Sequence, residues 1–152
     1  MKTYVRLALK TLIFLALFVG FSAAAEKPVK HPSPGDAGYP FSEAVSYGGV
    51  LYLSGEVGIR PDRTLAPGGI SAEARQTMDN IKTKLARYKL GMDDIIKCTV
   101  FLANIDEWGA FNDVYKTYFP NGEFPARSAL AASGLAIGAR VEVECLAAIA
   151  TD

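Results

Sequence analysis

An amphipathic segment followed at once by an apolar, strand-like run restricts this chain to folds in which a helix packs on a sheet. From Ser71 to Leu90 the apolar residues recur at steps of four and three, which predicts a helix with one apolar stripe. Ser71 is the expected N-cap and Gly91 the expected stop. The run Ile95–Leu102 is β-branched and almost continuously apolar, which is typical of a central strand covered on both faces. The stripe comprises Ala74, Met78, Ile81, Leu85 and Tyr88.

The other predicted elements complete an α+β order. Residues 41–54 predict a β-hairpin, because two strand-prone runs flank Gly48-Gly49, a pair that tolerates positive φ. An irregular loop is expected over residues 55–69, a second helix capped by Asp106 after the central strand, and strands over residues 127–132 and 141–149. The order is β-β-α-β-α-β-β in one domain, residues 40–152. The stripe of the second helix comprises Trp108, Phe111, Tyr115 and Tyr118.

Residues 1–25 have the three zones of a cleavable signal peptide. Basic residues at positions 2, 6 and 10 precede a short apolar run, and Ala23 and Ala25 supply the small side chains that a signal peptidase reads. The run is about half the ~20 residues that a spanning helix needs, which argues against the alternative of a transmembrane anchor. We expect an exported protein, and a Sec-type signal without an anchor favours the periplasm over the extracellular space. The Pro-rich residues 26–39 predict a flexible, extended tail.

Charge and histidine content argue against several classes of function. Cleavage would remove basic residues and no acid from a chain with 16 of each, leaving a mildly acidic protein. Nucleic-acid binding depends on clustered Lys and Arg, so this charge argues against it. The only histidine, His31, lies in the tail, which leaves the domain without one for a Ser-His-Asp triad, a metal site or a ribonuclease site.

The two cysteines, Cys98 and Cys145, both lie in predicted strands. Export would allow a disulfide between them. Their apolar surroundings favour two buried free thiols instead, and this is the state that the sequence predicts. Two cysteines without a nearby histidine do not predict a zinc site.

Two polar features interrupt the apolar strands. Arg127 begins one strand, and alternation in the last strand places Glu142 and Glu144 on one face, opposite its apolar residues. If the apolar side faces the helices, the two acids face solvent or another subunit. The simplest interpretation of Arg127 is a surface salt bridge to Glu142 or Glu144.

Six short segments together resemble the RidA (YjgF/YER057c/UK114) family. They follow the family's order and spacing over nearly the whole predicted domain, and the Pro-Ala-Arg-Ser and Val-Glu-Val-Glu segments are the most specific. The segments are 40–45 (PFSEAV), 53–56 (LSGE), 99–102 (TVFL), 111–115 (FNDVY), 124–128 (FPARS) and 141–144 (VEVE).

The resemblance implies a chorismate-mutase-like α+β fold that assembles as a homotrimer, with the sheets forming a barrel-like core and the helices outside. Active sites in this family lie in the three clefts between subunits. The implied activity is the hydrolysis of reactive 2-imino or enamine acids to 2-keto acids and ammonia, without a cofactor or metal. The implied partners are further copies of the chain and a small carboxylate-bearing imine, enamine or keto acid, with no nucleic acid and no membrane after cleavage.

The family's functional residues match positions in this sequence. Its carboxylate-binding arginine corresponds to Arg127, whose planar fork suits a carboxylate, and its acid beside the attacking water corresponds to Glu142. Ser54-Gly55 matches its Ser-Gly pair at the pocket, and Asn112 matches a pocket asparagine. The backbone carbonyl near Ala129 is expected to hold the water together with the acid.

Four departures from the family pattern leave the activity open. Phe41 stands where the family commonly has a pocket tyrosine, and Ala129 where close relatives often have cysteine. Glu56 replaces a usual glutamine, and Leu135-Ala136 replaces Leu-Pro. Beside an imine deaminase, the alternatives are a non-catalytic protein that binds a small carboxylate or another metabolite in the same cleft, and an endoribonuclease, which the acidic, histidine-free domain argues against. No sequence feature supports or excludes a chaperone role.

Overall fold

The computed structural model describes residues 26–35 and 38–150, which form a seven-stranded mixed sheet and two α-helices. The strand order is β1-β2-β3-β7-β5-β6, and β4 also pairs with β7. Every pairing is antiparallel except that of β5 with β6. The elements are β1 (Val29–His31), β2 (Ala44–Tyr47), β3 (Val50–Leu53), β4 (Glu56–Val57), α2 (Ile70–Arg87), β5 (Ile95–Leu102), α3 (Trp108–Tyr115), β6 (Ala126–Ala131) and β7 (Val141–Ala148). This architecture confirms the predicted α+β class.

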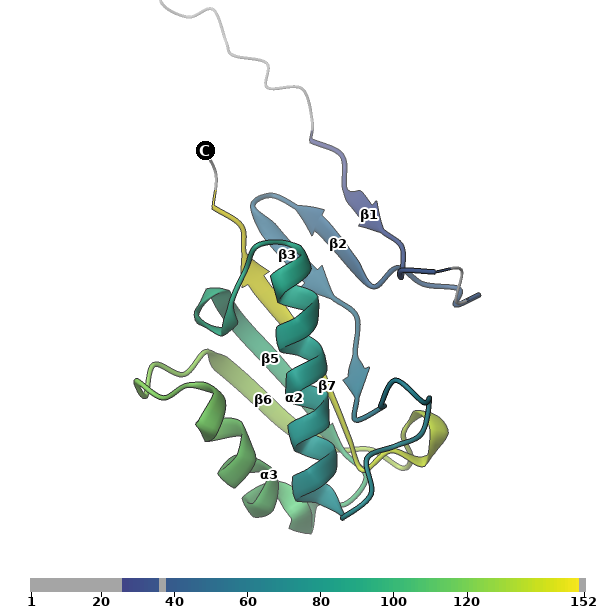
Figure 1. The fold of residues 1–152 in the computed structure, drawn as a ribbon. Coiled ribbons are helices and arrows are strands. Elements are labelled where there is room, and N and C mark those ends of the chain that lie inside the picture. The colour runs from purple at the N-terminus through teal and green to yellow at the C-terminus, as the bar shows by residue number, and fades with distance from the viewer. Residues whose placement is uncertain (1–25, 36–37, 151–152) are drawn as a thin grey trace, which may run out of the picture.

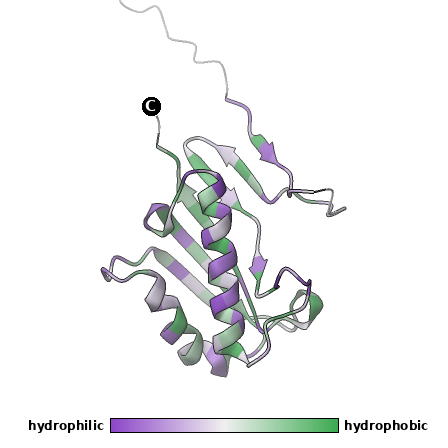
Figure 2. Cartoon of the chain, viewed as in Figure 1, coloured by the Kyte–Doolittle hydropathy of each residue, from purple (hydrophilic) through white to green (hydrophobic). Residues whose placement is uncertain are grey.

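Both helices cover the same face of the sheet (Figure 1). The buried stripe of α2 packs on alternate residues of β5 and β7, and Figure 2 shows hydrophilic residues along the side of α2 that faces the viewer. The opposite face of the sheet is uncovered in the single chain and carries Tyr52, Ile96 and Leu130, each more than 40% exposed (42%, 46% and 44%). In the single chain the helices therefore cover only one face of β5, and coverage of its other face stays a prediction.

The ends of α2 differ from the predicted ones. The helix begins at Ile70 after Gly69, whose φ is 79°, and Ser71 lies inside it rather than at its N-cap. It ends at Arg87, before the predicted stop at Gly91, because Lys89 adopts a left-handed conformation with a φ of 60°. The N–H groups of Lys89 and Leu90 then bond back to the last turn, which satisfies its carbonyls.

The second helix also begins differently from the prediction. The side chain of Asn104, rather than Asp106, accepts the capping hydrogen bond, from the backbone N–H of Asp106 itself. A 3-10 turn at Ile105–Glu107 leads into α3, and another at Lys116–Tyr118 follows it. The middle of the predicted stripe, Phe111 and Tyr115, is buried as expected.

Segments without predicted strands add two strands to the sheet. Val29–His31 lies in the predicted tail, yet it pairs with β2. The ring Nε2 of its last residue, His31, shares a hydrogen bond with the Ser46 hydroxyl at 3.0 Å. Glu56–Val57 lies in the predicted loop and pairs with β7. The tail therefore contributes a strand that covers the edge of β2.

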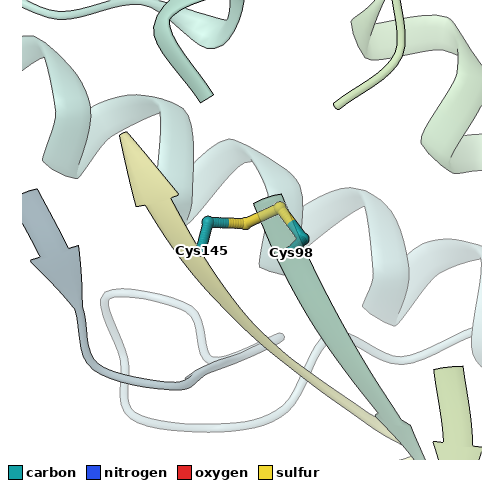
Figure 3. Close-up of a disulfide and its surroundings, with 2 residues drawn as sticks. All are labelled: Cys98 and Cys145. Atoms are coloured by element: carbon teal, nitrogen blue, oxygen red, sulfur yellow. A yellow bond between two sulfur atoms is a disulfide. The ribbon is translucent and has the colours of Figure 1, made fainter. Parts of the chain in front are cut away.

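The two cysteines form a disulfide, so the prediction of two free thiols is wrong. Cys98 on β5 is directly opposite Cys145 on β7, with their Cα atoms 4.1 Å apart. Both side chains point to the helix-covered face and are buried, and the bond ties the two central strands together (Figure 3). Register, rather than the polarity of the surroundings, brings the two sulfur atoms together.

The predicted signal peptide lies outside the described residues. Within the part of the chain that the structure does describe, no helix combines the length and the apolar character needed to cross a bilayer.

Candidate functional site

Arg127 lies on the edge strand β6 and extends toward α3. It is opposite Cys98 in the parallel pairing of β5 with β6, so it shares the helix-covered face of the sheet. Its Nη2 donates a hydrogen bond to Oδ1 of Asn112 at 2.5 Å. The guanidinium carbon is 4.5 Å from the ring centre of Tyr115 and 5.5 Å from that of Phe111. The structure thus brings Arg127 and Asn112, two of the predicted site residues, into direct contact.

The guanidinium retains unused donors in this arrangement. Among residues 26–35 and 38–150, its bond to Asn112 is its only hydrogen bond, and it enters no ion pair. Since a guanidinium has five N–H donors, the remaining ones are available to an anion. Arg127 is only partly buried, so such an anion can reach it from solvent.

Glu142 lies on the other face of the sheet. On β7 its neighbours Val141 and Val143 are fully buried beneath the helices, whereas Glu142 is opposite Val57 of β4 and Phe101 of β5 and points away from the helices. Its carboxylate lies directly against Gly55, where an added Cβ would overlap it. The predicted alternation of β7 is confirmed.

Because Arg127 and Glu142 lie on opposite faces, one chain does not bring them together. The simple interpretation of Arg127 as the partner of Glu142 or Glu144 in a surface salt bridge is therefore wrong. In the described residues, Arg127 instead contacts α3. Ala129 is two residues further along β6, so it shares the face of Arg127.

Two further predicted site residues, Phe41 and Ser54, flank the β2–β3 hairpin. Ser54 follows β3, and its hydroxyl donates a hydrogen bond to the backbone carbonyl of Ser42 at 2.7 Å. Phe41 is 55% exposed and stacks on Tyr39, with ring centres 5.1 Å apart. Of the predicted residues, the structure thus places Asn112 and Ala129 with Arg127 on the helix-covered side of the sheet, and Gly55 beside Glu142.

A buried charged network lies next to Gly55, and the sequence did not predict it. Glu43 is 3% exposed and accepts hydrogen bonds from Nη1 of Arg87 at 2.6 Å and from the hydroxyl of Tyr88 at 2.9 Å. Glu56, next to Gly55, forms an ion pair with Lys84. Burial raises the pKa of Glu56 above its usual value, although the charge of Lys84 acts in the opposite direction. The only sequence signal was the replacement of the family's usual glutamine by Glu56.

Glu73 fixes the start of β7. Its Oε1 accepts hydrogen bonds from the backbone N–H groups of Arg140 at 2.6 Å and Val141 at 3.3 Å. This buried carboxylate in the first turn of α2 therefore determines where the strand that carries Glu142 begins.

The chemistry that these groups offer is carboxylate binding on one side and water activation on the other. A guanidinium with free donors binds a planar carboxylate, and a half-buried carboxylate can orient a water molecule. Among the described residues, no group of three or more His, Cys, Asp or Glu side chains is arranged to hold a metal ion.

Comparison with known proteins extends the sequence resemblance. The chain is 39% identical over 109 residues to the mouse 2-iminobutanoate/2-iminopropanoate deaminase, a match that covers 71% of this chain and 80% of the mouse protein. The crystal structure of YyfA from Yersinia pestis, a member of the conserved Rid protein family, is 36% identical, with a TM-score of 0.71 and coverage of 84% of this chain and 98% of that one. E. coli TdcF, solved with bound serine, is 26% identical, with a TM-score of 0.69 and coverage of 80% and 94%.

The family model described as Endoribonuclease L-PSP matches residues 32–149, which is nearly all of the described part of the chain. The fold and the relatives agree with this match. The chain belongs to the endoribonuclease L-PSP family, the RidA family that its sequence resembles, and this family includes imine deaminases.

Proposed function

We propose that this protein hydrolyses 2-imino acids and their enamine forms to 2-keto acids and ammonia. The observation that carries the proposal is the Arg127 guanidinium, which contacts Asn112 and Tyr115 and keeps free donors for a carboxylate. The similarity to proteins named 2-iminobutanoate/2-iminopropanoate deaminase supports the same substrate class. The serine bound to E. coli TdcF is also a small molecule with an α-carboxylate, as the proposed substrates are.

In this proposal the active site is completed between chains of a homotrimer. Arg127 and Glu142 lie on opposite faces of the sheet, so a single site that contains both needs two copies of the chain. The uncovered sheet face supplies a suitable contact surface, because it carries the exposed apolar side chains of Tyr52, Ile96 and Leu130. The helices would then lie on the outside of the trimer.

The proposed reaction begins when Arg127 binds the substrate carboxylate and so positions the adjacent imine carbon. A water molecule held by Glu142 and by the backbone carbonyl near Ala129 attacks this carbon, and Glu142 takes a proton from the water. Glu142 passes this proton to the imine nitrogen, which gives a tetrahedral amino-alcohol. Glu142 then takes the proton of the new hydroxyl and delivers it to nitrogen as the C=O bond forms and the C–N bond breaks. The products are a 2-keto acid and ammonia. Since an imine is already electrophilic, positioning supplies most of the catalysis.

Export is part of the proposal. Residues 1–25 would direct the chain across the inner membrane and be removed near Ala25, which places the mature protein in the periplasm. A disulfide between Cys98 and Cys145 agrees with an oxidising compartment, because such bonds rarely persist in a reducing cytosol.

The test is the release of ammonia and keto acid from 2-iminobutanoate generated in situ by an amino-acid oxidase. Wild-type protein is expected to accelerate release over the spontaneous rate, and Arg127→Ala is expected to abolish the acceleration. Binding of 2-oxobutanoate without any acceleration would replace the deaminase by the non-catalytic carboxylate-binding function. Undiminished turnover by Arg127→Ala would remove Arg127 from the site.

A further inference from the structure

Tyr115 lies beneath the guanidinium of Arg127. Its ring centre is 4.5 Å from the guanidinium carbon, closer than that of Phe111 at 5.5 Å. Tyr115 is 4% exposed and packs between two other rings, with centre distances of 5.6 Å to Phe111 and 5.0 Å to Phe119. The ring therefore has little freedom to tilt, and it offers the guanidinium a fixed face.

The hydroxyl of Tyr115 contributes little to this arrangement. It is buried and has no hydrogen-bond partner among residues 26–35 and 38–150. Burial raises the pKa of the phenol to about 12, so it stays neutral, although the charge of Arg127 acts in the opposite direction. A neutral ring retains the negative π face that attracts a cation. The ring, rather than the hydroxyl, is thus the part of Tyr115 that acts on Arg127.

A long arginine side chain needs two constraints to present its fork in one orientation. Asn112 provides one by accepting a hydrogen bond from Nη2, and it holds one end of the guanidinium. A single hydrogen bond still allows the plane to rotate about it. Contact with the ring face of Tyr115 restricts that rotation, and Asn112 and Tyr115 lie three residues apart on α3, which holds both in a fixed relation.

We propose that Tyr115 is a positioning residue that sets the plane of the Arg127 guanidinium and so the affinity of the site for a carboxylate. This inference rests on the proposed carboxylate-binding role of Arg127. An anchor of this kind acts equally on bound substrate and transition state. Its loss is therefore expected to raise KM and leave kcat nearly unchanged.

The test compares Tyr115→Leu with Tyr115→Phe. Binding of 2-oxobutanoate is measured by calorimetry, and KM and kcat are measured with 2-iminobutanoate. Tyr115→Leu is expected to weaken binding and raise KM by about tenfold, within the range of a partly desolvated cation–π contact. Tyr115→Phe keeps the ring, so its dissociation constant for 2-oxobutanoate and its KM are expected to lie within about threefold of the wild-type values.

Tyr118 provides a matched control on the same segment. Its hydroxyl bonds to the backbone carbonyl of Arg75 at 2.9 Å and to Asp79 at 2.8 Å, and neither partner belongs to the proposed site. Tyr118→Leu is expected to leave 2-oxobutanoate binding unchanged. Equal weakening by the Tyr118 and Tyr115 leucine variants would overturn the inference, because both effects would then be structural.

A double-mutant cycle separates positioning from a general loss of structure. If Tyr115 acts through Arg127, adding Tyr115→Leu to Arg127→Ala produces no further weakening. Additive effects, or wild-type binding by Tyr115→Leu alone, would overturn the inference while the role of Arg127 stands. If the wild type binds 2-oxobutanoate but does not turn over 2-iminobutanoate, the proposed reaction is overturned. The double-mutant cycle, measured by 2-oxobutanoate binding, then still tests the role of Tyr115. A wild type that neither binds nor turns over these compounds would overturn both.

Discussion

The disulfide between Cys98 and Cys145 makes a large, measurable contribution to stability. The two residues are 47 positions apart in sequence, so the bond closes a loop that contains α3, its two flanking 3-10 turns and β6. A loop of this length lowers the entropy of the unfolded chain enough to stabilise the folded state by about 4 kcal/mol. That is a substantial part of the ~5–15 kcal/mol by which domains are usually stable.

The perturbation is reduction of the wild type, with Cys98→Ala/Cys145→Ala as the second arm. Reduction breaks only the bond and leaves both side chains in place, whereas the double variant also removes two buried sulfur atoms. Urea unfolding at one fixed protein concentration is expected to give a free energy of unfolding about 4 kcal/mol lower after reduction. The double variant is expected to be at least as unstable and insensitive to reductant.

The outcome that refutes this reasoning is direct to observe. Protein purified after export and unfolded without reductant should expose no free thiol to a thiol-reactive dye. Two reactive thiols, together with an unfolding midpoint that reductant does not change, would show that the cysteines are the buried free thiols that the sequence alone predicted.

Two further predictions concern the Glu142 side of the site. Gly55→Ala is expected to lower kcat/KM for 2-iminobutanoate by at least about tenfold, because the added Cβ displaces the carboxylate of Glu142, and wild-type kcat/KM in a folded variant would contradict this. Burial raises the folded-state pKa of Glu56 above 4.5, so its contribution to stability is fully present below pH 4.5 and decreases as pH rises through the folded pKa. In Glu56→Gln the urea midpoint should therefore fall less steeply than in the wild type as the pH rises above 4.5. An identical slope in both proteins would exclude Glu56 as the source of the pH dependence.

Elements that depend on local periodicity could be predicted from the sequence. The stripe of α2 and the alternation of β7 follow from steps of three to four and of two, and both are found as expected. Helix ends were less predictable, because they depend on single backbone conformations. The left-handed conformation of Lys89, a residue type without a preference for it, ends α2 earlier than Gly91 would.

Features that depend on contacts between distant segments could not be predicted. The disulfide needs the register that places Cys98 opposite Cys145, and the network around Glu43 joins the residue before β2 to the C-terminal end of α2. The β1 strand needs the edge of β2, which no local pattern in the tail reveals. The family resemblance predicted Arg127 and Asn112 as site residues, but the contact of Arg127 with Tyr115 appears only in three dimensions.

The central claim is that each active site takes Arg127 from one chain and Glu142 from another. The most direct measurement is the imine deaminase activity of mixed trimers assembled from Arg127→Ala and Glu142→Gln chains. Each variant alone is expected to be inactive. After co-refolding at equal amounts, about a quarter of the sites should combine an intact Arg127 with an intact Glu142, which predicts about a quarter of wild-type activity. No recovered activity in a trimer shown to contain both chains would contradict a site shared between subunits.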